Sequence, residues 1–497
     1  MAAPRTDDGA AESERSEHAQ RDERDEQDER EHDGAGQRAD ASGTGPVGER
    51  KVTAVRRMRA LRAAGCAVLL AVALTAGSIA AGGARDGGSG AAGAGADDGS
   101  AVGAPAGAGL RLGVDRLQAH LRDQPKDSGA WAALGLALVE RARTDGDPSR
   151  YPKAEQALKR SLALAPGNHE ALAGQAALAA ARHAFGTALT RADQALRQNP
   201  YSELALAARI DALVELGRYD EAAQAADTAD RRRPGVPVFT RYAYVRELRG
   251  DTDTARRVLE QALASATAPA DVAYAATQLG DLARSQGEYG TALRHYARAL
   301  AADDAYPPAL EGRARARAAS GDRAGAVRDL ERLVARAPLP GPLVALGELY
   351  EAGGEETAAR EQYALVDAWT ALARAGGMRA DLDTALAAAD HGDAAEALRA
   401  ARAAWERRRT VHTADALAWA LHVNGRSEQA LPYARRALAT GYRNAAFLYH
   451  RGMIERAVGR AEDARRHLTA ALELDPGFSP LGAREARAAL QDLGGDR

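Results

Sequence analysis

The stretch LGDLARSQGEYGTALRHYARALAADD, residues 279–304, contains two helical segments separated by a short turn at residues 286–289. The small and apolar residues of each segment recur at spacings of three, four and seven, which places them on one face of an α-helix. They are Leu279, Gly280 and Ala283 in the first segment and Ala292, Tyr296, Ala299 and Leu300 in the second. Neither segment is long enough to bury its apolar face alone, so we expect the pair to pack against copies of itself.

Copies of this pair follow one another along most of the chain. An alanine near the start of the second helix recurs at spacings of 33 to 38 residues, as Ala154, Ala188, Ala222, Ala255, Ala292, Ala326, Ala359, Ala397, Ala430 and Ala464. A glycine stands five residues before it from the third copy onward, as Gly217, Gly250, Gly287, Gly321, Gly354, Gly392, Gly425 and Gly459. A proline ends several copies, as Pro166, Pro200, Pro234, Pro338 and Pro476. The sequence therefore predicts ten tandem helix–turn–helix units.

A repeat of about 34 residues built from two helices resembles the tetratricopeptide repeat. Alanine lets paired helices approach to about 8–10 Å, glycine ends a helix in a left-handed backbone conformation, and proline cannot continue a helix. The resemblance implies an all-α fold, a right-handed superhelical solenoid whose first helices line an inner groove. The alternative is an alanine-rich helical bundle with accidental spacing.

The array is expected to occupy residues 110–493 as one quasi-linear stack. A lone helix at 110–122 should cover its open N-terminal end, and a helix at 480–493 should close the other end. The closing helix has a charged outer face, which terminal repeats need for solubility. The second helix of the seventh unit is expected to run on to Gly376.

Three segments precede the array. Residues 1–57 are rich in charged residues and poor in large apolar ones, which predicts a disordered tail. Residues 58–84 are predicted to be a transmembrane anchor or a signal peptide, because 63–84 is a run of 22 residues without a charge. About 20 apolar residues suffice to span a bilayer. Residues 85–109, mostly glycine and alanine, are predicted to be a flexible linker.

Basic residues lie before the segment 63–84, so the positive-inside rule places the N-terminus in the cytoplasm and the repeats outside it. The chain is thus expected to be a single-pass cell membrane protein. Translation from Met58 rather than Met1 would instead produce a secretory signal peptide and a secreted protein. A third interpretation is a buried Ala/Gly helix in a cytosolic protein. Few lysines beside many arginines, alanines and glycines indicate a GC-rich, bacterial genome.

The composition and motifs argue against several kinds of chemistry. A formal net charge of −3 gives no basic surplus of the kind that nucleic-acid binding needs. The single cysteine, Cys66, allows neither an intrachain disulfide nor a multi-cysteine metal site. The pair His169-Glu170 lacks the second histidine of a zinc-protease helix, and no catalytic motif occurs. The sequence therefore predicts no enzyme, no cofactor and no metal site.

The predicted function is a non-catalytic scaffold that binds protein or peptide partners in the groove of the array. The predicted contact residues on the first helices are Tyr244, Arg315, Trp419, His422, Tyr449 and Met453. For Trp419 and Met453 the alternative is packing between units. Some relatives bind a C-terminal carboxylate with Lys and Asn, and Ala132 and Leu136 here predict no such clamp. A self-assembling structural subunit of an envelope complex and an unrecognised enzyme are the other candidates, and the oligomeric state is open.

Overall fold

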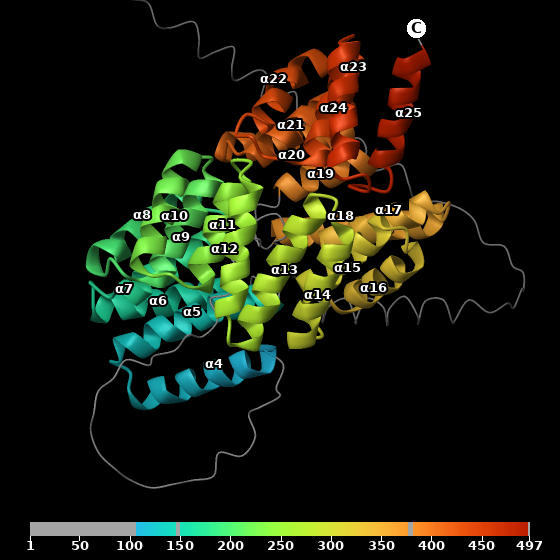
Figure 1. Ribbon diagram of the computed structural model, residues 1–497. Helices are drawn as coiled ribbons and strands as arrows, with labels where there is room; N and C mark the ends of the chain where they lie inside the picture. The colour runs from blue at the N-terminus through green and yellow to red at the C-terminus, as the bar shows by residue number, and fades with distance from the viewer. Residues whose placement is uncertain (1–105, 146–149, 376–380, 496–497) are drawn as a thin grey trace, which may run out of the picture. The chain divides into compact units, whose positions relative to one another are not determined.

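The computed structural model describes residues 106–145, 150–375 and 381–495, and these residues form 22 α-helices without a β-strand (Figure 1). Twenty of the helices form ten consecutive helix–turn–helix units. A single helix, α4 (Ala106–Asp123), precedes the first unit, and another, α25 (Gly482–Gly495), follows the last. The prediction of an all-α array of tandem helical pairs is confirmed for the described residues.

The units follow the sequence in order. Units 1 to 5 are α5 (Ser128–Asp145) and α6 (Tyr151–Leu164), α7 (His169–Ala181) and α8 (Phe185–Gln198), α9 (Glu203–Glu215) and α10 (Tyr219–Arg232), α11 (Val236–Glu247) and α12 (Thr252–Ser265), and α13 (Pro269–Ser285) and α14 (Tyr289–Ala302). Units 6 to 10 are α15 (Pro307–Ala319) and α16 (Arg323–Arg336), α17 (Pro340–Ala352) and α18 (Glu356–Ala375), α19 (Asp381–His391) and α20 (Ala394–Arg407), α21 (Val411–Val423) and α22 (Ser427–Ala437), and α23 (Ala445–Ala457) and α24 (Ala461–Leu474).

The first and second helices of the units form two layers that pack differently. From α5 to α17, and again from α19 to α25, each first helix contacts the first helix of the next unit. Second helices contact the first helices on both sides of them but make at most marginal contact with one another. The first helices therefore form the tighter, inner layer, and the second helices diverge.

The core between the units is built from small residues facing large ones. All ten seam alanines are at most 2% exposed. Tyr296 on α14 is fully buried, and Cβ atoms built on Gly280 and Gly312 would lie 2.6 and 2.4 Å from its ring. Those distances are far below van der Waals contact, so the ring fits only because the first helices of units 5 and 6 each present a glycine. The prediction that the 279–304 pair packs on a copy of itself is confirmed.

The turns between paired helices use the left-handed backbone that the glycines predict. Gly217, Gly250, Gly287, Gly321, Gly354, Gly425 and Gly459 have φ between 71° and 95°, whereas Gly392 is not in this region. In the second unit, which lacks the glycine, His183 takes the same conformation at φ 57°. Its amide donates to the carbonyl of Ala180, and the next amide donates to that of Ala179. The turn geometry is therefore kept even where the residue type is unfavourable.

The helices at the two ends of the array were also expected. The N-terminal helix α4 begins at Ala106, four residues before the predicted start, and buries Val114 and Leu121. In unit 7, α18 runs to Ala375, as its predicted extension requires. The predicted tail 1–57 and the predicted membrane or signal segment 58–84 lie outside the described residues. Among the residues that the structure does describe, none of the helices is sufficiently long and apolar to cross a membrane.

Units 3, 4 and 5 also contact units far ahead of them in the sequence. Carbonyl oxygens of Arg409, Gly441 and Leu474 lie against the turn glycines Gly217, Gly250 and Gly287, where an added Cβ would approach them to 2.3, 2.5 and 2.8 Å. The three carbonyls belong to successive junctions, between units 8 and 9, between units 9 and 10, and at the end of unit 10.

Side chains reinforce these long-range contacts. Glu215 forms a buried ion pair with Arg408, and the hydroxyl of Tyr219 accepts a hydrogen bond from the amide of Val411 at 2.8 Å. In unit 5, the Tyr289 hydroxyl donates to Asp475 and accepts from the Gly477 amide. A solenoid in which each repeat contacts only its neighbours would have none of these contacts. The expectation of a simple quasi-linear stack is therefore wrong for units 3 to 5 and 8 to 10.

Candidate interaction surface on the first helices

A row of charged side chains crosses three consecutive first helices in the middle of the array. We call it the first-helix row: Glu247 on α11, Asp281 and Arg284 on α13, and Glu311 and Arg315 on α15. The charge of Asp281 acts on Glu247, and the charges of Glu311 and Arg315 act on Asp281. The five groups therefore form one continuous electrostatic surface on the inner layer.

The carboxyl groups of this row are reached by water and yet crowded by protein. Glu247 and Asp281 are only half-buried. Desolvation by the surrounding protein, with the charge of Asp281 second, raises the pKa of Glu247 to about 7. Desolvation also raises the pKa of Asp281 to about 6, although Arg284 and a 2.7 Å hydrogen bond from the Tyr296 hydroxyl oppose the change. Side chains that keep contact with water while protein surrounds them are typical of a concave surface.

Several polar atoms of the row lack partners. Nε of Arg284 and Oε2 of Glu311 are buried without a hydrogen bond. Arg315 occupies only the other oxygen of Glu311, at 2.9 Å. The carboxyl of Glu247 has no hydrogen bond or ion pair to another described residue, although the charge of Arg284 acts on it. Because buried polar groups are almost always paired, the two unpaired atoms Arg284 Nε and Glu311 Oε2, on adjacent first helices, indicate a surface that a ligand can complete.

The six residues predicted to contact a partner fall into three places. Arg315 belongs to the first-helix row. Tyr244 is 8% exposed and lines a small enclosed cavity together with Glu215, Arg408 and His412, so units 8 and 9 cover it. The other four residues, Trp419, His422, Tyr449 and Met453, come together on α21 and α23.

The cluster on α21 and α23 is largely occupied by contacts within the protein. The Trp419 ring is 7% exposed and stacks on both His422 and His450, with centroids 5.0 and 4.3 Å away. Its Nε1 donates to Asp390 at 2.5 Å. Tyr449 is equally buried and donates to Glu485.

His422 and Met453 are half-buried at the margin of the same cluster. Trp419, Met453 and their neighbours thus pack between units 8 to 10 and α25. Partner binding by these residues stays a prediction.

Buried histidines next to this cluster form ion pairs. His450 lies 2.9 Å from Asp415, and although burial disfavours the charged ring, the adjacent carboxylate raises the pKa of His450 overall. His391 stacks on Tyr363 and faces Glu348, and its pKa is raised in the same way. Within 106–145, 150–375 and 381–495, no three His, Cys, Asp or Glu side chains are arranged to hold a metal ion.

Sequence reasoning missed Glu247, Asp281 and Arg284. A positional signal for them was present, because Asp281 and Arg284 stand one and four residues after the packing glycine Gly280. Those offsets lie on one helix face, beside the face that packs in the core. Charged residues at these offsets in adjacent units would have identified the row.

Comparison with known proteins identifies two parts of the array. A family model described as tetratricopeptide repeat matches residues 248–307 and 416–477. These two segments are therefore tetratricopeptide repeats, which confirms that prediction for units 5, 9 and 10. No curated protein matches the chain.

Several solved structures are similar to parts of the chain. PilW, a type IV pilus biogenesis factor, is 24% identical over 40% of this chain and 92% of its own, with a TM-score of 0.35. TTC0263 of Thermus thermophilus is 24% identical over 38% of this chain and 96% of its own, with a TM-score of 0.33. Human IFIT1 in a complex with m7Gppp-AAAA is 17% identical over 66% and 76%, with a TM-score of 0.44. At these identities the similarity concerns the helical-repeat fold alone.

Proposed function

We propose that this chain is a non-catalytic, bacterial scaffold that binds an extended segment of a partner protein along the first-helix row. The observation that carries the proposal is a pair of buried polar atoms without a hydrogen bond on adjacent inner-layer helices, Arg284 Nε on α13 and Glu311 Oε2 on α15. The half-buried carboxyl of Glu247 lies beside them on α11. Tetratricopeptide repeats generally mediate protein interactions, and tandem helical repeats offer extended surfaces for them.

The order of charges along the row defines what the partner should present. Glu247 and Asp281 place two carboxyls side by side, and Arg284 and Arg315 follow. A lysine or arginine of the partner between the two carboxyls would lower their raised pKa values and restore their charge. An acidic or carbonyl group of the partner would satisfy Arg284 Nε. The best ligand is therefore an extended peptide with a basic residue followed by an acceptor.

We also propose that the repeats act outside the cytoplasm, tethered to the cell membrane by residues 63–84. The support is the charge-free run and its basic N-terminal flank. N-terminal sequencing of the native protein tests the tether. A chain that starts at Met1 and keeps 63–84 is anchored, whereas a chain that starts near residue 81 is secreted and the tether is wrong.

Site-specific photo-crosslinking in cells tests the binding surface. A photoreactive amino acid replaces Arg315 in the first-helix row of the full-length chain, and a control chain carries it at the exposed Glu260 on the second helix α12. We expect a discrete crosslinked partner only from position 315, and its yield should fall when Glu247→Gln and Asp281→Asn are added.

Equal crosslinking from both positions would contradict the proposed surface. Crosslinking only to a second copy of the chain would favour the structural, self-assembling alternative, and light scattering would then measure the size of that assembly.

A further inference from the structure

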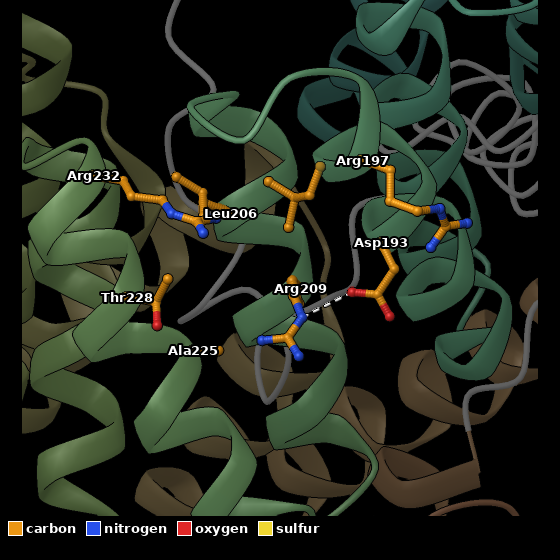
Figure 2. A pocket seen from close by; sticks show the side chains of 8 residues that line it. Asp193, Arg197, Leu206, Arg209, Ala225, Thr228 and Arg232 are labelled. Atoms are coloured by element: carbon orange, nitrogen blue, oxygen red, sulfur yellow. Dashed lines mark hydrogen bonds and ion pairs between the residues drawn. The ribbon is translucent and has the colours of Figure 1, made fainter.

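A separate pocket lies in the outer layer, between the second helices of units 2 and 3. Its volume is about 470 Å³, and α8, α9 and α10 supply its walls. Figure 2 shows Arg197 and Arg232 on either side of Leu206 and Arg209, with Arg209 joined to Asp193. This size is within the range of pockets that hold small molecules or single side chains of a partner.

The pocket faces away from the surface described above. Arg209 points into it, whereas Asp211, two residues later on α9, pairs with Arg241 of the next first helix. Two residues correspond to about 200° around an α-helix, so these side chains leave opposite sides of α9. A ligand in the pocket would not touch the first-helix row.

One wall of the pocket is formed where an arginine replaces a leucine of the repeat pattern. Arg209 stands thirteen residues before the seam alanine of unit 3, where units 5, 7 and 9 have Leu279, Leu346 and Leu417. Those leucines are at most 3% exposed and fill the space between helices. Arg209 is half-buried instead, and its guanidinium turns toward Asp193 at 2.8 Å. The space that leucine fills in units 5, 7 and 9 is thus hollow and charged in unit 3. Units 6 and 10 also have an arginine at this position, Arg313 and Arg451, which pair with Asp329 and Glu455.

The charge of the pocket is unbalanced. Three arginines face one carboxylate, and the only ion pair among them joins Arg209 to Asp193. Within the described part of the chain, Arg232 donates a long 3.3 Å hydrogen bond to the Pro200 carbonyl and forms no ion pair. Arg197 is exposed and has no partner among the residues that the structure describes. Leu196, Leu206 and Ala225 supply the apolar part of the lining, which we call the apolar floor.

We propose that this pocket binds an acidic peptide segment of a second protein, with a carboxylate on the arginines and a neighbouring aliphatic side chain on the apolar floor. Arginine binds carboxylates through two parallel hydrogen bonds, which makes it suitable for this recognition. The scaffold would then carry two separate docking surfaces, one on each layer of the array.

The test measures binding of a fluorescent pentapeptide that alternates glutamate and leucine, with both ends blocked, to the full-length chain by anisotropy. The wild-type chain should bind this peptide and not its glutamine–leucine analogue, and added salt should weaken the binding. Arg209→Leu restores the residue of units 5, 7 and 9, so it should fold normally and raise Kd by at least about tenfold. Arg197→Gln and Arg232→Gln should each raise Kd by about two- to fivefold.

Two controls separate the pocket from general charge and from folding. Arg298→Gln removes an exposed arginine from the second helix α14 and should leave Kd unchanged. Arg209→Gln keeps the pocket open without the charge and should weaken binding even if the leucine variant is unstable. Glu247→Gln acts on the other layer, so failure of either proposal leaves the other intact.

Unchanged binding by both Arg209 variants, or equal binding of the neutral analogue, would overturn the proposal. So would a titration in which inorganic phosphate binds and the acidic peptide does not, because the ligand would then be a free anion.

Discussion

Replacing Gly250 by alanine should destabilise this protein far more than the same replacement at Gly354. Both glycines end a first helix with nearly the same backbone, at φ 79° and 78°. A left-handed backbone costs a non-glycine residue about 1–2 kcal/mol. The two variants share this term, so any difference between them measures what surrounds the added methyl group.

The surroundings differ sharply. A Cβ on Gly250 would lie 2.5 Å from the carbonyl oxygen of Gly441 and 3.2 Å from its carbon, whereas a Cβ on Gly354 would meet nothing within 4 Å. An ordinary van der Waals contact begins at 3.4 Å, so the two backbone segments must move apart. Overpacking of this kind typically costs a further 1–3 kcal/mol. We expect a total of about 2–5 kcal/mol for Gly250→Ala and about 1–2 kcal/mol for Gly354→Ala.

Hydrogen–deuterium exchange with mass spectrometry can locate this loss, which one unfolding midpoint cannot do for a repeat array. In Gly250→Ala, exchange should accelerate at residues 438–444, about 190 positions away, because the contact between units 4 and 9 opens. Gly354→Ala should accelerate exchange only near its own turn. Equal destabilisation by the two variants, with no change at 438–444, would refute the long-range contact.

Three further predictions concern the same contacts and the first-helix row. Tyr289→Phe removes the hydroxyl that joins Asp475 and the Gly477 amide, so it should cost about 1–3 kcal/mol in chemical unfolding and accelerate exchange at 475–481. Arg408→Gln breaks the buried pair with Glu215, which should cost about 3–5 kcal/mol, and adding Glu215→Gln should recover part of that loss. The raised pKa of Glu247, about 7, means that the folded state holds this proton more tightly than the unfolded chain. Its stability contribution is therefore present below the unfolded value of 4.5 and is lost as the pH rises through 7. Glu247→Gln should therefore stabilise the protein at pH 8 by at most about 3 kcal/mol. The gain should be smaller than this limit because water reaches the carboxyl. A variant whose unfolding free energy keeps the wild-type pH dependence would contradict this prediction.

Local sequence patterns predicted the candidate sites only in part. Aromatic residues at first-helix positions suggested partner contacts, but Trp419 and Tyr449 are buried between units. Their burial depends on α25 and on histidines from adjacent helices, which no spacing rule places beside them. The arginine pocket and the first-helix row apart from Arg315 were not predicted, for a related reason. Each site consists of residues from several units. Within one unit these residues look like ordinary surface residues, and they form a site only when the units pack side by side.

The sequence by itself determines the repeat architecture. Helix period, seam alanine and turn glycine are local features, and each acts within a few residues or on the adjoining unit. Ten copies therefore specify ten helical pairs and the order in which they pack. Even the turn at His183 obeys the pattern, because the hydrogen bonds of the helix end impose its conformation.

Only the tertiary structure shows that Gly217, Gly250 and Gly287 lie against the backbone of a distant unit. The turn glycines Gly321, Gly354 and Gly459 have no such contact. In sequence these six glycines occupy the same position of the repeat. Whether a turn meets a segment about five units later depends on the small rotation between successive units, added over all of them. The total rotation depends on side-chain packing at every junction between units, so it cannot be predicted from the sequence of any single repeat.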